Sequence, residues 1–439
     1  MVPSGPEFER SLDEALAELE SPMPPFWRRL LSPSGLLVLL MVFLLVLAIL
    51  SFPNRLFDPD VQQITLTIGA LALWRYGWWM THAIRSDIYR RVRYPKMRRK
   101  ADAVWNAGWR PPVLHFMMTT YYEKPEITRK VLDSIVAQIR DAEIPAKVWI
   151  GTGSSYDERV ISDHIEATAE DLDAELTFVR QQQPGKRMAI GIVLRAIRRS
   201  GASARDLIVF MDGDAVLGEG VVQKSASLFG ADPELQALTT DEDVISYGPG
   251  WMGRWLKMRF AQRRIAMQSH ALSGKVLTLT GRMSMFRALH VLDSAFIRTV
   301  EADYLDHWLW GRFRFLSGDD KSTWYYLLTQ KVRMTYVPDA TVYTIEVIEG
   351  SGYTRMVANL RRWSGNMLRN GLRAIALGPR TVGPFIWWCL IDQRIAIWTT
   401  LVSPVLAFYG SLLAPSYAIS ALLWILATRT LLSLSLIHI

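Results

Sequence analysis

Two short acidic motifs stand where carboxylates can do chemistry, and the first is MDGDA (211–215), which follows the apolar run LIVF. Asp212 and Asp214 are two residues apart, so in an extended segment their side chains project to the same side. Such a pair can share a hard divalent cation, whose other ligands are water and phosphate oxygens. We therefore predict a Mg²⁺ or Mn²⁺ site for a nucleotide diphosphate; the alternative is a solvated acidic turn.

The second acidic motif, LSGDDKS (316–322), places Asp319 and Asp320 at the start of a predicted helix. A carboxylate here can serve as a general base if the attacking hydroxyl lies within hydrogen-bond reach. Carboxylates also favour helix N-termini for dipole reasons alone, by ~0.3–1 kcal/mol. The motif in isolation leaves both interpretations open.

Cations accompany the two acidic motifs. GKR (185–187) opens a predicted helix with Lys186 and Arg187, and TLTGRMSMFRA (278–288) places Arg282 after a predicted strand. Gly281, just before it, permits close approach of the backbone. These residues suit an anionic substrate, and they suit ordinary loop–helix junctions equally well.

A third cationic motif, ANLRRWSGN (358–366), lies on a helix with an apolar and an arginine-rich face. The Arg362 guanidinium matches phosphate oxygens bidentately, which suits a diphosphate. The Trp363 ring can stack on a sugar. The alternative is a basic interfacial helix with an anchoring tryptophan.

The region that must position these motifs, from about residue 101 to 350, alternates strand-like and helical segments. Strands are predicted at 112–121, 146–153, 176–181 and 206–215, and helices at 126–142, 157–172 and 188–200. This alternation predicts an α/β domain with a parallel sheet and crossover helices. Ligands of such sheets bind beyond the carboxyl ends of the strands, where the first acidic motif falls.

Long apolar runs precede this domain. Residues 36–50 are unbroken apolar sequence, which extends to about 30–52 and suffices to cross ~30 Å of hydrocarbon. No small-residue cleavage site follows, so a membrane anchor is favoured over a signal peptide. A second candidate span, 61–83, contains Arg75 beside several aromatic residues; this arginine either lines a polar cavity or reaches the interface.

The net charge of the 439-residue chain is +8, and half of its residues are hydrophobic, which excludes a disordered protein. A single cysteine, Cys389, excludes a disulfide scaffold. Residues 85–100 hold eight basic residues and one acid, so most of the excess charge follows the second apolar run. The positive-inside rule makes this segment cytoplasmic and the two spans a hairpin. The charge thus indicates topology and anionic lipid rather than nucleic acid.

We expect five parts in all. They are an acidic N-terminal segment (1–29, a surface helix or a tail), two transmembrane helices (30–84), a cytosolic domain (85–350), amphipathic interfacial helices (351–394) and C-terminal transmembrane helices (395–439). Within the last two parts, 351–377 and 381–392 are the interfacial stretches, and 395–413 and 417–437 are the candidate spans.

The order of the motifs, enclosed by apolar spans, resembles the processive, inverting synthases of glycosyltransferase family two, which include cellulose, chitin and hyaluronan synthases. Within that family the chain is most similar to bacterial alginate (mannuronan) synthases. The matching stretches are WRYGWWMTHAIR (74–85), RFAQRRIAMQSHALSGKVLTLTGRMSMFRA (259–288), GRFRFLSGDDKS (311–322), YVPDA (336–340) and DQRIAIWTT (392–400). The C-terminus looks shorter than the family's, which would leave the translocation path incomplete.

The resemblance implies a GT-A-type domain between transmembrane helices, with a role for each motif. Asp212 and Asp214 match the metal and diphosphate motif, and Asp320 matches the catalytic base, with Asp319 beside it. The resemblance further implies that the donor diphosphate contacts Lys186, Arg187, Arg362 and Trp363. It implies that the acceptor or a uronate carboxylate contacts Arg282, Lys321 and Trp363. The nucleotide base would pass near residues 115–119. The family's Gln-x-x-Arg-Trp motif has Asn359 at its Gln position here.

The implied activity is transfer of mannuronate from GDP-mannuronate to a growing polymannuronate chain, with Mg²⁺ or Mn²⁺ and with export across the bacterial inner membrane. The implied protein is multi-pass with a cytoplasmic catalytic domain, contacts membrane lipid, and works with a cyclic di-GMP-binding co-polymerase subunit and other alginate export proteins. Two alternatives stay open. One is a cellulose-, chitin- or hyaluronan-type synthase using a UDP-sugar, and the other is a non-catalytic membrane scaffold that binds nucleotide sugar.

Overall fold

The structure is a computed structural model. It describes residues 5–20, 59–169, 174–182, 185–307, 309, 311–314, 318–415, 417–418 and 421, together with scattered positions between 25 and 46. The chain forms two compact units, one of residues 1–16 with 85–390 and one of 17–84 with 391–439.

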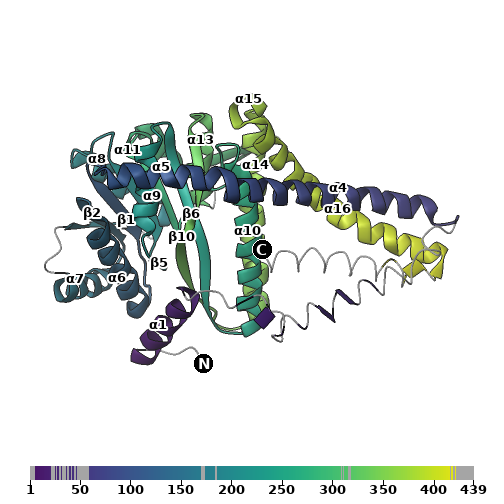
Figure 1. Cartoon of the computed structure of the whole chain (residues 1–439), viewed down its shortest axis with the longest axis horizontal. Helices are drawn as coiled ribbons and strands as arrows, with labels where there is room; N and C mark the ends of the chain where they lie inside the picture. The colour runs from purple at the N-terminus through teal and green to yellow at the C-terminus, as the bar shows by residue number, and fades with distance from the viewer. Residues whose placement is uncertain are drawn as a thin grey trace. The chain divides into compact units, whose positions relative to one another are not determined.

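The first unit is built on an eight-stranded sheet in the order β3-β2-β1-β4-β7-β6-β10-β5 (Figure 1). Its strands are β1 (Leu114–Thr119), β2 (Ala146–Thr152), β3 (Ala174–Arg180), β4 (Leu207–Asp212), β5 (Ala215–Leu217), β6 (Leu235–Tyr247), β7 (Met283–Arg287) and β10 (Arg333–Val347). A separate two-stranded sheet pairs β8 (Tyr304–His307) with β9 (Gly311–Arg314).

Helices cover both faces of the large sheet, as the α/β prediction requires (Figure 1). One face carries α5 (Tyr94–Asn106), α6 (Pro125–Ala142), α7 (Ser155–Thr168) and α9 (Val221–Ala231), which pack on one another. The other carries α8 (Lys186–Arg199), α12 (Ser294–Glu301) and α13 (Asp319–Thr329). The remaining elements of this unit are η1 (Tyr89–Arg93), α10 (Gly250–Ala271), α11 (Ala288–Val291), α14 (Gly352–Ala376) and α15 (Pro379–Val382).

The predicted parallel sheet is confirmed for β3, β2, β1 and β4. Beyond β4 the sheet is mixed, because β6 and β10 run parallel to each other whereas β7 and β5 are antiparallel to their neighbours. Thr119 at the end of β1 is in register with Asp212 at the end of β4, so both side chains reach the same edge. Next to β4, however, β7 runs antiparallel. The reason is that residues 278–282 are a loop at this edge and not the end of a strand, so the strand that follows must run back.

The second unit contains most of α4 (Gln62–Ile88) and of α16 (Pro384–Leu413). Among the described helices, Pro384–Leu413 is the one long and apolar enough to cross a membrane. One continuous helix, Pro384–Leu413, covers most of the predicted interfacial stretch 381–392 and the whole candidate span 395–413. The candidate spans at 30–52 and 417–437 lie mostly outside the described residues.

Arg75 on α4 has an acidic partner within its own unit. Its guanidinium donates to both carboxylate oxygens of Asp392 on α16, at 2.9 and 3.2 Å, and the Trp74 indole N–H donates to the same carboxylate at 3.2 Å. A buried charge needs such a partner, since its desolvation is otherwise uncompensated. Arg75 is therefore held by an ion pair within its unit, a partner that neither sequence interpretation had named.

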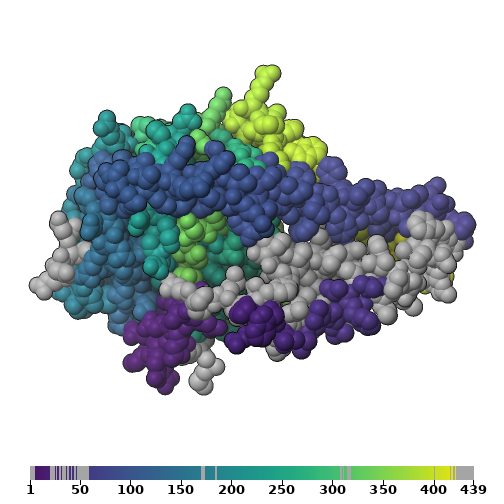
Figure 2. All heavy atoms as spheres, in the orientation of Figure 1, coloured from purple at the N-terminus to yellow at the C-terminus, as the bar shows by residue number. Residues whose placement is uncertain are grey.

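The acidic N-terminal segment forms a helix, α1 (Pro6–Glu20), which packs on the first unit. Phe8 is fully buried, and its ring lies 4.7 Å from that of Tyr247 on β6. Glu9 pairs with Arg129 of α6 at 3.0 Å. Figure 2 shows the purple N-terminal atoms lying against the surface of the first unit. Of the two sequence interpretations, a surface helix is confirmed and a free tail is wrong for these residues.

Candidate active site

The first acidic motif lies at the carboxyl end of β4. Asp212 is the last residue of this buried strand, and Asp214 stands in the turn before β5. Burial and the nearby charge of Asp212 raise the pKa of Asp214 to about 7. Two carboxylates so close together gain from a cation between them, which is the environment the metal prediction requires.

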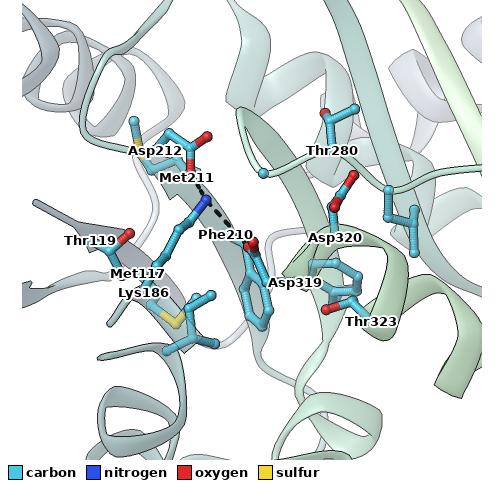
Figure 3. Close-up of a pocket in the computed structure, with 14 residues that line it drawn as sticks. Met117, Thr119, Lys186, Phe210, Met211, Asp212, Thr280, Asp319, Asp320 and Thr323 are labelled. Atoms are coloured by element: carbon cyan, nitrogen blue, oxygen red, sulfur yellow. Dashed lines mark hydrogen bonds and ion pairs between the residues drawn. The ribbon is translucent and has the colours of Figure 1, made fainter. Parts of the chain in front are cut away.

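Lys186, the first residue of α8, joins the two acidic motifs (Figure 3). Its ammonium nitrogen lies 2.6 Å from Asp212 Oδ1 and 3.3 Å from Asp319 Oδ2. Burial alone would lower the pKa of Lys186, but the two carboxylates outweigh it and raise that pKa above its ordinary value. The structure therefore brings together three of the predicted site residues from three different elements.

The second acidic motif begins α13 after a turn that requires glycine. Gly318 has φ +88°, in the left-handed region, and a Cβ there would lie 2.7 Å from the Asn366 amide nitrogen. The helix therefore starts at Asp319, and the next carboxylate, Asp320 Oδ2, accepts a hydrogen bond from the Thr278 hydroxyl at 3.3 Å.

The two neighbouring carboxyls of α13 have opposite pKa shifts. Burial alone would raise the pKa of Asp319, but Lys186 outweighs it and lowers that pKa. Burial and the charge of Asp319 raise the pKa of Asp320. Paired groups whose pKa values move apart are typical of an acid–base site. The greater basicity of Asp320 favours it as the proton acceptor.

Two cavities surround these groups. The first is lined by Lys186, Asp212, Thr280, Asp319, Asp320 and nine other residues, so it lies between the end of β4 and the start of α13 (Figure 3). Gly281 borders it, and a Cβ there would lie 3.1 Å from both the Asp212 carboxylate and the Lys186 nitrogen. Glycine therefore permits the close approach of the backbone to these two side chains, as predicted.

The second cavity, of about 330 Å³, lies at the ends of β1 and β3. It is lined by Thr119, Thr120, Tyr121, Glu123, Gln181, Gly185, Lys186, Ala189, Asp212, Gly213 and Asp214. Of the predicted stretch 115–119, Thr119 contributes, whereas His115 is buried near the opposite, amino end of β1, with Asp206 at 3.2 Å. Glu123 was not predicted; its only sequence signal is a position just after a strand end.

Arg187 points away from both cavities into the packing of α13. Its guanidinium donates to the Val300 carbonyl at 2.7 Å and to the Ser322 hydroxyl at 2.9 Å. Ser322 in turn donates to Asp303, whose other partner is Arg373 of α14 at 2.8 Å. In this structure protein acceptors therefore engage Arg187 and help to hold α13 in place, and the contact of Arg187 with the donor stays a prediction.

The arginine-rich helix α14 is less of a membrane-surface helix than its pattern suggests. Its polar face has a buried stripe formed by Asn359, Asn366 and Asn370, and the helix packs on α13. Asn359, at the expected glutamine position, accepts a hydrogen bond from exposed Arg362 at 3.4 Å. The Trp363 ring stacks on Trp255 with centroids 5.8 Å apart.

The two residues predicted for a uronate carboxylate have different environments. Lys321 donates to the Leu277 carbonyl at 2.5 Å, and burial lowers its pKa to about 8. Arg282 pairs at 2.9 Å with Glu242, which is fully buried and also pairs with Arg263 at 2.9 Å. Neither Glu242 nor Arg263 was predicted, because each lies within an ordinary strand or helix pattern.

Residues 111–366, more than half of the chain, match the protein family described as "Glycosyltransferase like family 2". This chain belongs to that family. The match spans both acidic motifs, the GKR motif and the Arg-Trp motif.

Two curated relatives of this glycosyltransferase are both named glycosyltransferase alg8. One, from Pseudomonas syringae pv. tomato, is 37% identical over 389 residues, which cover 88% of this chain and 78% of the relative. The other, from Azotobacter vinelandii, is 36% identical over 400 residues, which cover 91% and 81%. The resemblance to alginate synthases and the glycosyltransferase activity it implied are confirmed.

Solved structures that resemble this glycosyltransferase include the mannosyltransferase PcManGT from Pyrobaculum calidifontis in complex with GDP-Man and Mn²⁺. It is 18% identical with a TM-score of 0.45, covering 82% of this chain and 98% of that one. TarS of S. aureus (residues 1–349) is 12% identical with a TM-score of 0.35, covering 60% and 65%.

Asp319→Asn tests the origin of the basicity of Asp320 in this glycosyltransferase. A base must be ionised, so the rate falls as the pH drops through the raised pKa of Asp320. Removing the neighbouring charge takes away one cause of that rise, so the acid limb of the pH–rate profile should move to lower pH. The check is the residual rate of sugar transfer between pH 4 and pH 9. Asp163→Asn, at an exposed position of α7, should leave the acid limb of the profile in place. If the acid limb of Asp319→Asn stays in place or moves to higher pH, the charge of Asp319 is not a cause of the raised pKa of Asp320.

Arg373→Met tests the network beneath α13. Asp303 is 3% exposed, and removing its cationic partner leaves a buried charge unpaired. Such a change typically costs about 3–5 kcal/mol of unfolding free energy. Thermal unfolding of the purified glycosyltransferase should therefore begin at lower temperature, whereas Arg361→Met, on the exposed face of α14, should change little. Adding Asp303→Asn to Arg373→Met should restore part of the loss; equal stability of all variants would contradict a supporting role.

Proposed function

We propose that this glycosyltransferase polymerises mannuronate from GDP-mannuronate into polymannuronate, the alginate chain, and is processive and inverting. The observation that carries this proposal is the 36–37% identity to the two alg8 glycosyltransferases over about nine tenths of the chain. The site supports it, because a basic carboxyl and a diphosphate-type acidic motif lie on opposite sides of one cavity.

Asp320 would accept the proton of the acceptor 4-hydroxyl while that oxygen attacks the anomeric carbon of the donor. The new glycosidic bond forms as the bond from the anomeric carbon to the diphosphate oxygen breaks, and GDP leaves with that electron pair. Attack from the face opposite the leaving group inverts the anomeric configuration. General-base assistance of this kind is typically worth 10²–10⁴-fold in rate.

The diphosphate would be held by Lys186 with Asp212 and Asp214. A Mg²⁺ or Mn²⁺ ion suits the two aspartates, since both are hard oxygen ligands and burial makes their joint ionisation unfavourable without a cation. Such an ion, when bound, neutralises charge on the departing diphosphate. On donor binding, Lys186 would exchange its contact with Asp212 for the phosphate oxygens while keeping Asp319 ionised.

We propose that the exposed Arg362 contacts the diphosphate and that the stacked Trp363 contacts the acceptor sugar. Beyond the site, we propose a multi-pass protein of the bacterial inner membrane with a cytoplasmic catalytic unit, and coupling of synthesis to export. Partners would be lipid, a cyclic di-GMP-binding co-polymerase subunit and other export proteins. Apolar α16 and the basic segment 85–100 support the membrane part of this proposal.

The test is to supply membrane vesicles containing the full chain with labelled GDP-mannuronate and, separately, with labelled UDP-sugars. Polymer labelled from GDP-mannuronate and degraded by an alginate lyase is the expected result. Incorporation from UDP-sugars alone would establish the cellulose-, chitin- or hyaluronan-type alternative. Binding of GDP-mannuronate without any transfer, in vesicles with all export partners present, would establish the scaffold alternative.

A further inference from the structure

A buried carboxylate beside the active site is shared by two arginines. Glu242 on β6 has a fully buried side chain, and its Oε2 accepts hydrogen bonds from Arg263 of α10 and from Arg282, both at 2.9 Å. No other carboxylate among the described residues pairs with either guanidinium. This cluster of three groups therefore carries a net charge of +1, and the Arg263 Nη2 nitrogen is buried without a partner in the described structure.

The adjacent ion pair shows that this excess is particular to the cluster. Asp241 and Arg264 are the chain neighbours of Glu242 and Arg263, and they pair one to one at 2.7 Å. The charges of Asp214, Asp212 and Glu346 also act on Arg282, so the excess belongs to Arg263, whose one ion-pair partner among the described residues is the shared Glu242. A partly buried cation that shares its counter-charge is unfavourable, because its desolvation is not fully repaid. One carboxylate shared by two arginines can therefore accept a second anion as counter-charge, whereas the Asp241–Arg264 pair is already neutral.

The cluster lies directly behind the loop that touches both halves of the active site. Arg282 follows Gly281, which abuts Asp212, and the same loop holds Thr278, which donates to Asp320. The charge of Arg282 acts on Asp214, and that of Arg263 acts on Lys321. The Arg282 guanidinium lies 5.0 Å from the Phe260 ring centroid, which limits its orientations.

The chemistry of the excess charge points to a carboxylate ligand. Lys186 and the two aspartates already suit the diphosphate, so the arginine pair serves a different anion. A planar guanidinium fork matches a carboxylate bidentately. The side chains of Arg263 and Arg282 are 20% and 24% exposed, while Glu242 behind them is 0% exposed, so a ligand would meet guanidinium edges. Lys321 is a weaker choice, since its ammonium donates to the Leu277 carbonyl.

We propose that Arg263 and Arg282, held by Glu242, form the subsite that binds a uronate carboxylate and select uronic acids over neutral hexoses. The inference rests on the proposed function and adds to it the residues that determine sugar specificity. The carboxylate belongs either to the donor mannuronate or to the mannuronate at the chain end, since both have the same chemistry.

The experiment compares the full-length wild type and Arg263→Met in lipid nanodiscs with Mn²⁺. One arm measures Kd for GDP-mannuronate, GDP-mannose and GDP, which share the nucleotide and differ at the sugar C6. The other measures KM for oligomannuronate acceptors. In Arg263→Met we expect either the Kd for GDP-mannuronate in the first arm or the KM for the acceptor in the second to rise tenfold or more, which corresponds to about 1.4 kcal/mol. The Kd values for GDP-mannose and GDP should stay within twofold.

Two variants separate this subsite from a merely structural cluster. Arg254→Met, on an exposed position of α10, should leave all values unchanged. Arg263→Lys keeps the charge and should recover part of the discrimination, and it replaces Arg263→Met if that variant does not fold. A wild-type preference for GDP-mannuronate together with an unchanged acceptor KM in Arg263→Met, or equal weakening of all three donors, overturns the subsite alone. A wild type that makes no polymer from GDP-mannuronate and does not prefer it to GDP-mannose overturns the proposed function as well.

Discussion

Asp320→Asn should abolish polymer formation, lowering the rate by about 10²–10⁴-fold. The amide has nearly the shape of the carboxylate but cannot accept the proton of the attacking hydroxyl. The hydrogen bond from Thr278 to Oδ2 can be kept by the amide oxygen, so the start of α13 should hold its place. The measurement is incorporation of labelled sugar by vesicles with equal amounts of wild type and variant.

Binding of GDP should survive this substitution, because Asp320 is proposed to contact the acceptor and not the nucleotide. A loss of rate with an unchanged Kd for GDP would therefore assign the effect to the chemical step. Asp163→Asn makes the same chemical change on the exposed face of α7 and should leave the rate intact. Normal synthesis by Asp320→Asn would remove it as the base, and Asp319 would become the candidate.

Asp214→Asn should reduce polymer formation by about 10²–10³-fold, the usual cost of losing one group that stabilises developing charge. The variant loses one of two oxygen ligands for the cation, so the diphosphate would leave with its charge less well neutralised. Burial and the charge of Asp212 raise the pKa of Asp214 to about 7. The asparagine therefore also relieves repulsion, and the variant should be at least as stable as the wild type.

Loss of a metal-binding carboxylate should lower activity and leave the melting temperature unchanged or higher. Loss of a structural carboxylate should lower both activity and melting temperature. Affinity for GDP should depend on Mn²⁺ in the wild type and lose most of that dependence in Asp214→Asn. Glu219→Gln, an exposed carboxylate shortly after β5, is the matched control. Full synthesis by the wild type after treatment with a chelator would contradict a metal at this site.

Several features of the site were predictable because they depend on near neighbours in the chain. Asp212 ends a run of apolar residues that can only be a buried strand, so its carboxylate had to lie at a sheet edge. Gly318 and Asp319 likewise mark a helix start through their own backbone preferences. The elements around them were predicted to within a few residues, as in α6, expected at 126–142 and observed at Pro125–Ala142.

In two other places a local pattern allows more than one tertiary environment, and the sequence alone did not indicate the one observed. The arginines of α14 are typical of a membrane surface, yet the helix packs on α13 and one stripe of its polar face is buried. The buried amides find their partners within α14 itself, because Asn366 accepts from Arg369 and Asn370 donates to the Asn366 carbonyl. Arg187 suited a diphosphate by type and position, but the folded chain offers it the Val300 carbonyl and the Ser322 hydroxyl.

The sequence by itself determined the α/β class, the acidic motifs and their order, the excess of positive charge after an apolar run, and the family. These follow from composition, from periodicity and from residues close together in the chain. Only the tertiary structure decided that Lys186 lies between Asp212 and Asp319, that β7 runs back beside β4, and that Glu242 is shared by two arginines. Each of these joins residues far apart in sequence, and such pairs form only when the sheet and its covering helices close on a common core.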